Sequence, residues 1–130
     1  MWVYVQKTGE LIAPDGEVLR GNYSGLGVGK NNPDAQHVVG IGPIPRGRYF
    51  MGAPFDSPEH GPHCIRLTPD AANEMFGRRG FLVHGDSISA PGMASKGCII
   101  ASRSTRLRMG AKRDVLEVIA DRVNIKDVML

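Results

Sequence analysis

The sequence lacks several features that would assign it to a large class of proteins. It contains only two cysteines, Cys64 and Cys98, which is too few for the disulfide framework of a small secreted protein. No run approaches the roughly 18 apolar residues of a membrane-spanning helix, so no membrane span is expected. Aromatic residues make up 6% of the chain and do not alternate with a stripe of lysine and arginine, so nucleic acid is not an expected partner.

The amino-terminal segment also lacks an export signal. Residues 1–16 have no basic region followed by an apolar stretch, so they do not resemble a secretory signal peptide. We therefore expect synthesis in the cytoplasm and reduced cysteines, with one disulfide as the alternative. The net charge of +3 suits an anionic partner but does not require one.

Glycine and proline, in contrast, are abundant. Seventeen glycines and nine prolines in 130 residues predict many turns, and therefore strands rather than long helices. The hydrophobic content of 42% is enough for a core, and neither a repeat nor a linker interrupts the chain. We expect residues 1–130 to form a single, mainly β domain, β-sandwich-like, with one or two short helices.

Apolar runs and turn signals place the expected elements. Strands are expected at 2–6, 48–51, 63–67, 81–83, 99–100 and 114–120, with a hairpin turn at 13–16, a long loop at 21–34 and a tail at 123–130. One helix is expected at 68–80, with Thr68 as N-cap and Pro69 at its first position. A second is expected at 104–113, with Ser104 as N-cap.

Residues 81–100, FLVHGDSISAPGMASKGCII, combine the residue types of nucleophilic catalysis. An apolar strand ends at His84, and a turn-rich loop can return the chain so that Cys98, 14 positions later, faces it. A Cys–His pair is the minimum for nucleophilic acyl transfer. Gly97 permits a tight turn whose backbone N–H groups can hold an oxyanion, and Lys96 can favour the thiolate. A buried core cysteine is the simpler alternative for Cys98.

This segment resembles the active-site signature of the L,D-transpeptidase catalytic domain, the YkuD-type family. The family pattern, His-Gly, a loop, then Ser/Thr-x-Gly-Cys, is matched by His84, Gly85, Ser95, Gly97 and Cys98. Residues 8–19 and 24–50 are similar to the opening hairpin and the Gly-Pro-rich strand of that family, so the resemblance covers roughly residues 5–120. The similarity is greatest to a short branch without signal peptides, which includes toxins delivered by type VI secretion systems.

Two positions depart from the family pattern. Many members have a second histidine directly before Gly-Cys, where this chain has Lys96, and an arginine two residues after the cysteine, where it has Ile100. Another residue must then bind the substrate carboxylate. Arg103 is the nearest in sequence, and Arg66 and Arg46 are further candidates.

The resemblance implies acyl transfer on the stem peptides of bacterial peptidoglycan. The Cys98 thiolate would attack a diaminopimelate carbonyl and expel D-alanine, with His84 moving the proton and the N–H groups of Gly97 and Cys98 holding the oxyanion. Asp86, directly after His84-Gly85, is a candidate for substrate binding by orienting a donor, but we favour its role as a cap of the turn. Transfer of the thioester to an amine or to water gives L,D-transpeptidase, D-amino-acid exchange or L,D-carboxypeptidase activity, without a metal or organic cofactor.

The implied substrate also implies a route of delivery. Peptidoglycan lies outside the cytoplasm, so a secretion system or phage lysis would carry the protein to the periplasm. An antibacterial effector of this kind would have an immunity protein as partner.

Three alternatives to acyl transfer on stem peptides are a zinc site, a non-catalytic binding module and an endopeptidase. Zinc could bind at HGPHC, through His60, His63 and Cys64, but the spacing is not a standard zinc pattern and adjacent strand residues point to opposite faces, so we expect no metal. A wall-binding or phage structural module would use the groove without catalysis and leave the Cys98 thiol unreactive. A cysteine endopeptidase would use the same pair of residues on peptidoglycan cross-bridges.

Overall fold

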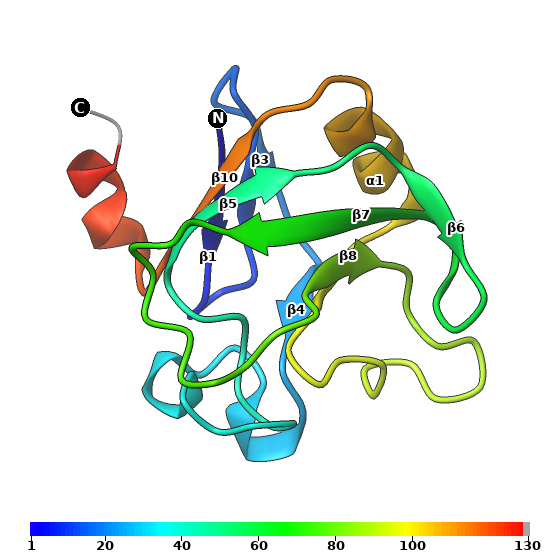
Figure 1. Cartoon of the computed structure of the whole chain (residues 1–130), viewed down its shortest axis with the longest axis horizontal. Coiled ribbons are helices and arrows are strands. Elements are labelled where there is room, and N and C mark those ends of the chain that lie inside the picture. Colours follow the sequence, from blue (N-terminus) through cyan, green and yellow to red (C-terminus); the bar gives the residue numbers. More distant parts are fainter. Residues whose placement is uncertain (129–130) are drawn as a thin grey trace.

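Ten strands dominate the computed structural model, which describes residues 1–128 (Figure 1). The strand order is β3-β2-β1-β10-β5-β7-β8-β9-β4, and β6 pairs with β7 outside this path. The mainly β class with few short helices is therefore confirmed. Residues 129–130 of the expected tail lie outside the described residues. Within the described chain, no helix has the length and apolar character needed to cross a bilayer.

The strands are β1 (Trp2–Val5), β2 (Leu11–Ile12), β3 (Val18–Leu19), β4 (Tyr23–Ser24), β5 (Gly47–Met51), β6 (Phe55–Ser57), β7 (Gly61–Pro69), β8 (Leu82–His84), β9 (Ile99–Ile100) and β10 (Val115–Ile119). The helical segments are α1 (Arg103–Gly110) and the 3₁₀ turns η1 (Gly27–Gly29), η2 (Pro33–Ala35) and η3 (Arg122–Asp127). Every expected strand is present, but β4 and β6 were not expected. β4 lies in the predicted long loop, where it pairs with the distant strand β9.

The helix predicted at 68–80 is wrong. Thr68 and Pro69 belong to β7 and pair with β5. Asn73 then takes the place of a strand partner, because its side chain accepts a hydrogen bond from Arg48 N–H at 3.0 Å and donates to the Arg48 carbonyl at 2.8 Å. Asp70 accepts from the Ala72 N–H at 2.9 Å. Such side-chain bonds to backbone compete with a helix, so this segment turns instead.

The second predicted helix is confirmed as α1, with one correction. Its N-cap is Ser102, whose hydroxyl accepts from the Thr105 N–H, rather than Ser104. Thr105, Arg106 and Met109 are its buried residues, at the spacing of one helix face. This face packs against β7.

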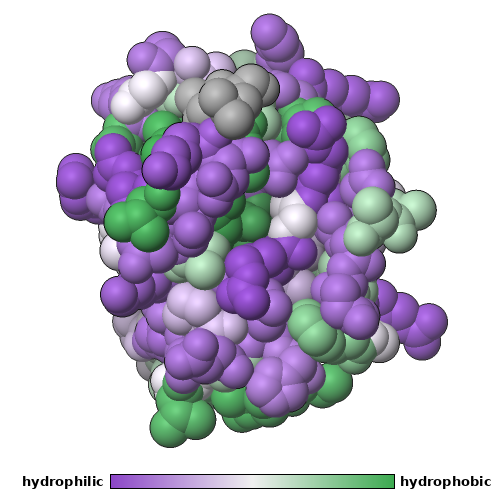
Figure 2. Space-filling model, turned by 90° about the vertical axis from the view of Figure 1, so that its left-hand side faces the viewer, coloured by the Kyte–Doolittle hydropathy of each residue, from purple (hydrophilic) through white to green (hydrophobic). Residues whose placement is uncertain are grey.

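The core gathers where the two ends of the chain meet. β1 and β10 are parallel neighbours in the middle of the sheet (Figure 1). Tyr4 and Leu116, from these two strands, are fully buried in the main core cluster with Tyr49 of β5 and Met109 of α1. The face shown in Figure 2, on the side where η3 lies, is mostly hydrophilic with scattered apolar spots. On that face, few apolar residues are therefore exposed.

β8 and β9 position the candidate catalytic residues. They are parallel neighbours with Val83 opposite Ile99 and His84 opposite Ile100, so the loop of residues 85–98 returns the chain beside β8. Cys98, which directly precedes β9, therefore lies beside Leu82. The backbone therefore follows the predicted path: the loop returns the chain from His84 to a strand that lies beside β8.

Arg78 connects the loops around this motif. Its side chain is only 7% exposed, and its two terminal nitrogens donate to the carbonyl oxygens of Gln36, Gly42, Pro43 and Lys96 at 2.6–3.2 Å. The guanidinium also lies over the ring of Phe81, at 5.3 Å from its centroid. One side chain thus joins the 36–43 loop to the segment that leads to Cys98.

This network predicts a large effect on stability. Arg78→Met leaves four backbone carbonyls without a donor, so the free energy of unfolding should fall by about 3 kcal/mol or more. Arg78→Lys keeps the charge and part of the hydrogen bonding, so its free energy of unfolding should fall by less. Urea unfolding followed by circular dichroism measures both. Arg79→Met is the matched control, because Arg79 is exposed and should change stability by less than about 0.5 kcal/mol. Equal effects at the two positions would contradict the proposed role of Arg78.

Candidate active site

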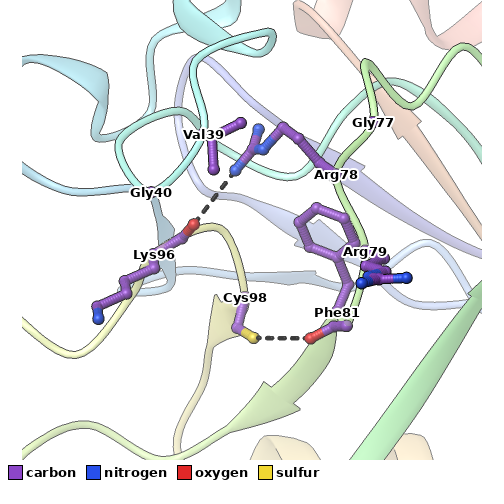
Figure 3. Close-up of a pocket in the computed structure, with 9 residues that line it drawn as sticks. Val39, Gly40, Gly77, Arg78, Arg79, Phe81, Lys96 and Cys98 are labelled. Atoms are coloured by element: carbon purple, nitrogen blue, oxygen red, sulfur yellow. Dashed lines mark hydrogen bonds between the residues drawn. The ribbon is translucent and has the colours of Figure 1, made fainter.

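Cys98 lies in the wall of a pocket of about 370 Å³ (Figure 3). The lining residues are Val39, Gly40, Gly77, Arg78, Arg79, Gly80, Phe81, Lys96 and Cys98. The half-buried thiol accepts a hydrogen bond from the Leu82 N–H at 3.3 Å and points to the Gly80 carbonyl at 3.8 Å. The sulfur is thus held by the backbone of the segment that leads into β8.

The environment of Cys98 favours the protonated thiol. Burial raises the pKa of the Cys98 thiol above its usual value, although the Leu82 N–H and the Arg78 guanidinium act in the opposite direction. Lys96, which the sequence suggested as the activating cation, is exposed, and its ammonium group is directed away from the thiol in Figure 3. Sequence reasoning missed Arg78, because nothing in its local pattern indicates a buried guanidinium.

His84 ends β8 and is only 3% exposed. Its Nδ1 lies 2.8 Å from the Gly85 carbonyl oxygen. Since a carbonyl only accepts, Nδ1 carries a proton and the neutral ring has its lone pair at Nε2. Burial lowers the pKa of His84, as do His60 and Arg106 by charge, so a neutral imidazole is favoured. His84 is therefore set up to accept a proton at Nε2.

His84 and Cys98 are near neighbours but are not hydrogen-bonded in this structure. The thiol instead bonds to the backbone of Leu82 and Gly80, and His84 lines a separate pocket of about 270 Å³. Two residues of offset on adjacent parallel strands separate their Cα atoms by about 8 Å. Contact between the His84 and Cys98 side chains therefore stays a prediction.

Ser95 and Gly97 shape the turn before Cys98. The buried Ser95 hydroxyl donates to the Cys98 carbonyl at 2.5 Å and accepts from the N–H groups of Gly25 and Gly97 at 2.9 and 3.1 Å. Gly97 has φ of +137°, and a Cβ there would lie 2.5 Å from the Arg78 guanidinium, so only glycine fits. Because the Gly97 N–H is bound by Ser95, the Cys98 N–H is the better candidate for an oxyanion donor.

Asp86 acts within the loop rather than in the Cys98 pocket. Its carboxylate accepts from the Tyr23 hydroxyl at 2.6 Å and from the backbone N–H groups of Ser87 and Gly92. Burial raises the pKa of Asp86, but these hydrogen bonds outweigh it and hold the pKa below its usual value. These contacts favour the interpretation of Asp86 as a cap of the turn.

The structure does not bring the three candidate arginines into the Cys98 pocket. Arg103 is exposed in the first turn of α1, Arg66 lies over the Phe55 ring, and Arg46 donates to Gln6. Register places Arg66 opposite Leu82, one strand beyond the strand that neighbours Cys98. The cationic residues that line the pocket are instead Arg78, Arg79 and Lys96.

The residues of the HGPHC segment make different contacts. Cys64 is fully buried and its thiol donates to the Gly61 carbonyl, while the His60 ring stacks on His84. His63 has φ of +55°, which takes it out of regular strand geometry. Among residues 1–128, no group of three or more histidine, cysteine, aspartate or glutamate side chains is arranged to hold a metal ion.

Comparison with known families assigns the chain. The curated proteins include no match to it. The sequence model of the Tlde1 domain matches residues 20–123, which include β4 to β10, His84 and Cys98. Tlde1 proteins are effectors of type VI secretion, so the effector class suggested by the sequence is confirmed, whereas the reaction at Cys98 is not assigned by this match. Because the match spans most of its length, the chain belongs to the Tlde1 domain family of type VI secretion effectors.

Proposed function

We propose that this effector is a peptidoglycan enzyme that uses Cys98 as the nucleophile in acyl transfer on stem peptides. The observation that carries the proposal is the pairing of a pocket-lining thiol with a histidine on the adjacent strand whose free lone pair is at Nε2. A Cys–His pair in this state supplies both the nucleophile and the general base. Such an effector would act in the periplasm of a target cell, and the producing cell would need an immunity protein.

The chemistry follows from the protonation states. The resting pair is a neutral thiol and a neutral imidazole, so His84 takes the thiol proton as the sulfur attacks the carbonyl carbon. The Cys98 N–H stabilises the resulting oxyanion. When the C–N bond breaks, His84 returns the proton to the leaving amine and a thioester remains on Cys98. Water then releases the acid (L,D-carboxypeptidase), or an amine takes the acyl group (L,D-transpeptidase or D-amino-acid exchange).

The charge of the pocket suits the carboxylates of a stem peptide. Arg78, Arg79 and Lys96 line it, and no acidic residue is among its lining residues. The terminal nitrogens of Arg78 are already bonded to four carbonyls, so it contributes charge rather than new hydrogen bonds. Arg79 and Lys96 are exposed, and their side chains can donate to a ligand. We assign these two residues the role that the sequence left to Arg103, Arg66 or Arg46.

One observation favours a second function, a wall-binding module without catalysis. The raised pKa of the Cys98 thiol and its backbone hydrogen bonds are what an unreactive cysteine would show. Both functions predict binding of stem peptides, but only the enzyme releases D-alanine. Turnover therefore separates them.

Replacing either member of the pair should abolish turnover. With a stem tetrapeptide as substrate and mass spectrometry of the products, Cys98→Ala and His84→Ala should each reduce turnover by more than about 100-fold, because a nucleophile and its base act as one unit. Cys64→Ala is the matched control. It should retain turnover, since the one side-chain hydrogen bond of Cys64 among the described residues is to the Gly61 carbonyl. Binding without turnover by the wild type would favour the wall-binding module.

Alkylation by iodoacetamide should distinguish the two cysteines and report the resting state. Cys98 should react before the fully buried Cys64, as seen by peptide mapping. Because its pKa is raised, the rate should increase with pH through the alkaline range, without the plateau near pH 6 of a preformed thiolate–imidazolium pair. Faster labelling of Cys64, or such a plateau, would contradict this assignment.

The cationic pocket should prefer a free carboxylate. Turnover of the tetrapeptide should exceed that of its C-terminal amide by about 10-fold, because a charge-assisted hydrogen bond is lost with the amide. The Arg79→Gln, Lys96→Gln double variant should reduce this preference without abolishing turnover of the amide. Equal turnover of acid and amide by the wild type would refute the carboxylate role of this pocket.

A further inference from the structure

A second histidine covers the candidate general base. The ring of His60 stacks on the ring of His84, with centroids 4.3 Å apart and planes inclined by 23°. His60 itself is exposed, whereas His84 is buried. The outer ring therefore lies between His84 and solvent at the pocket that both residues line.

The turn between β6 and β7 fixes His60 through its backbone. The Ser57 hydroxyl accepts from the N–H groups of Glu59 and His60 at 3.2 and 3.1 Å. The only charged neighbour of His60 among the described ion pairs is Glu59, at 3.9 Å, and that carboxylate is exposed. β7 pairs with β8, so the turn and His84 belong to one hydrogen-bonded sheet. The stacked contact is thus set by the hydrogen-bonded turn and strands rather than by a polar partner of the His60 ring.

We propose that His60 is a positioning residue for His84, holding its ring in the orientation in which Nδ1 meets Gly85 and Nε2 remains for Cys98. Stacking covers one face of the imidazole and so fixes the plane of the ring, and within that plane the hydrogen bond to Gly85 selects the flip that leaves Nε2 free. The inference rests on the proposed function only for the role of His84 in catalysis. The stacking and its effect on the titration of His84 do not depend on it.

The charged groups around His84 define the expected effect of pH. His60, in the β6–β7 turn, and Arg106, on α1, both oppose a positive charge on His84. Asp86, in the loop after β8, favours a positive charge on His84. Cys64, which the register of β7 places opposite His84, carries a thiol with a raised pKa and stays neutral. Removing His60 takes away both a cover and a repelling charge. The pKa of His84 should therefore rise toward its usual value, and the base should be lost at a higher pH as the solution is acidified.

The test is a titration of the His84 Cε1 proton by NMR in four proteins. His60→Ala should raise the midpoint of His84 relative to the wild type. His60→Phe, which keeps a stacked ring without a titrating group, should raise it less. His37→Ala is the matched control, because His37 is an exposed histidine in edge contact with Phe76, and it should leave His84 unchanged. An unchanged midpoint in His60→Ala would overturn the proposal.

Kinetics then separate this inference from the proposed function. For the tetrapeptide, His60→Ala should lower kcat about 10-fold with little change in KM and move the acidic limb of the pH profile to higher pH, while His60→Phe restores most of kcat. If His60→Ala shifts the midpoint of His84 but the wild type shows no turnover, the stacking role is retained and the enzyme is rejected. Turnover that is insensitive to His60→Ala, in rate and in pH profile, would reject the positioning role and retain the enzyme.

Discussion

The buried guanidinium of Arg78 is the contact on which the candidate site depends. Four backbone carbonyls from two loops converge on it, and each would be costly to bury without a donor. The same group lies beside the pocket of Cys98 and over the ring of Phe81. Its position also explains Gly97, since a side chain there would collide with the guanidinium. The Arg78 guanidinium therefore both holds the two loops together and supplies positive charge near Cys98.

The resting site keeps its two reactive groups apart and neutral. Burial acts in the same sense on both, because it disfavours charge: it raises the pKa of the Cys98 thiol and lowers that of His84. The thiol is meanwhile bonded to the backbone of β8 rather than to the imidazole. With a raised pKa, the Cys98 thiol carries little thiolate in this structure. Low reactivity at rest is compatible with a toxin that must be made and carried before it acts.

Contacts from one sheet organise the surroundings of His84, the candidate base. Gly85 fixes the tautomer from one side, and His60 covers the ring from the β6–β7 turn. Asp86, one residue further, is used to hold the loop through Tyr23 and Gly92. Within three consecutive residues, 84–86, the chain thus provides the candidate base, the carbonyl that orients its ring and the anchor of the loop that leads to Cys98.

The sequence by itself determined the mainly β class, the strands with apolar runs and α1, because these depend on local patterns. It also predicted the loop that returns the chain from His84 to the strand beside it, whereas contact between the His84 and Cys98 side chains stays a prediction. It could not exclude a helix at 68–80: the segment begins with residue types typical of a helix N-terminus, but Thr68 and Pro69 pair with β5 and Asn73 bonds to the backbone of Arg48. It could not identify Arg78 or His60 either. Burial of a guanidinium by distant carbonyls and stacking of two histidines 24 positions apart arise only when separate strands and loops meet. Tertiary structure alone decided the charge of the pocket and the resting position of the thiol, because both depend on long-range contacts that no local pattern encodes.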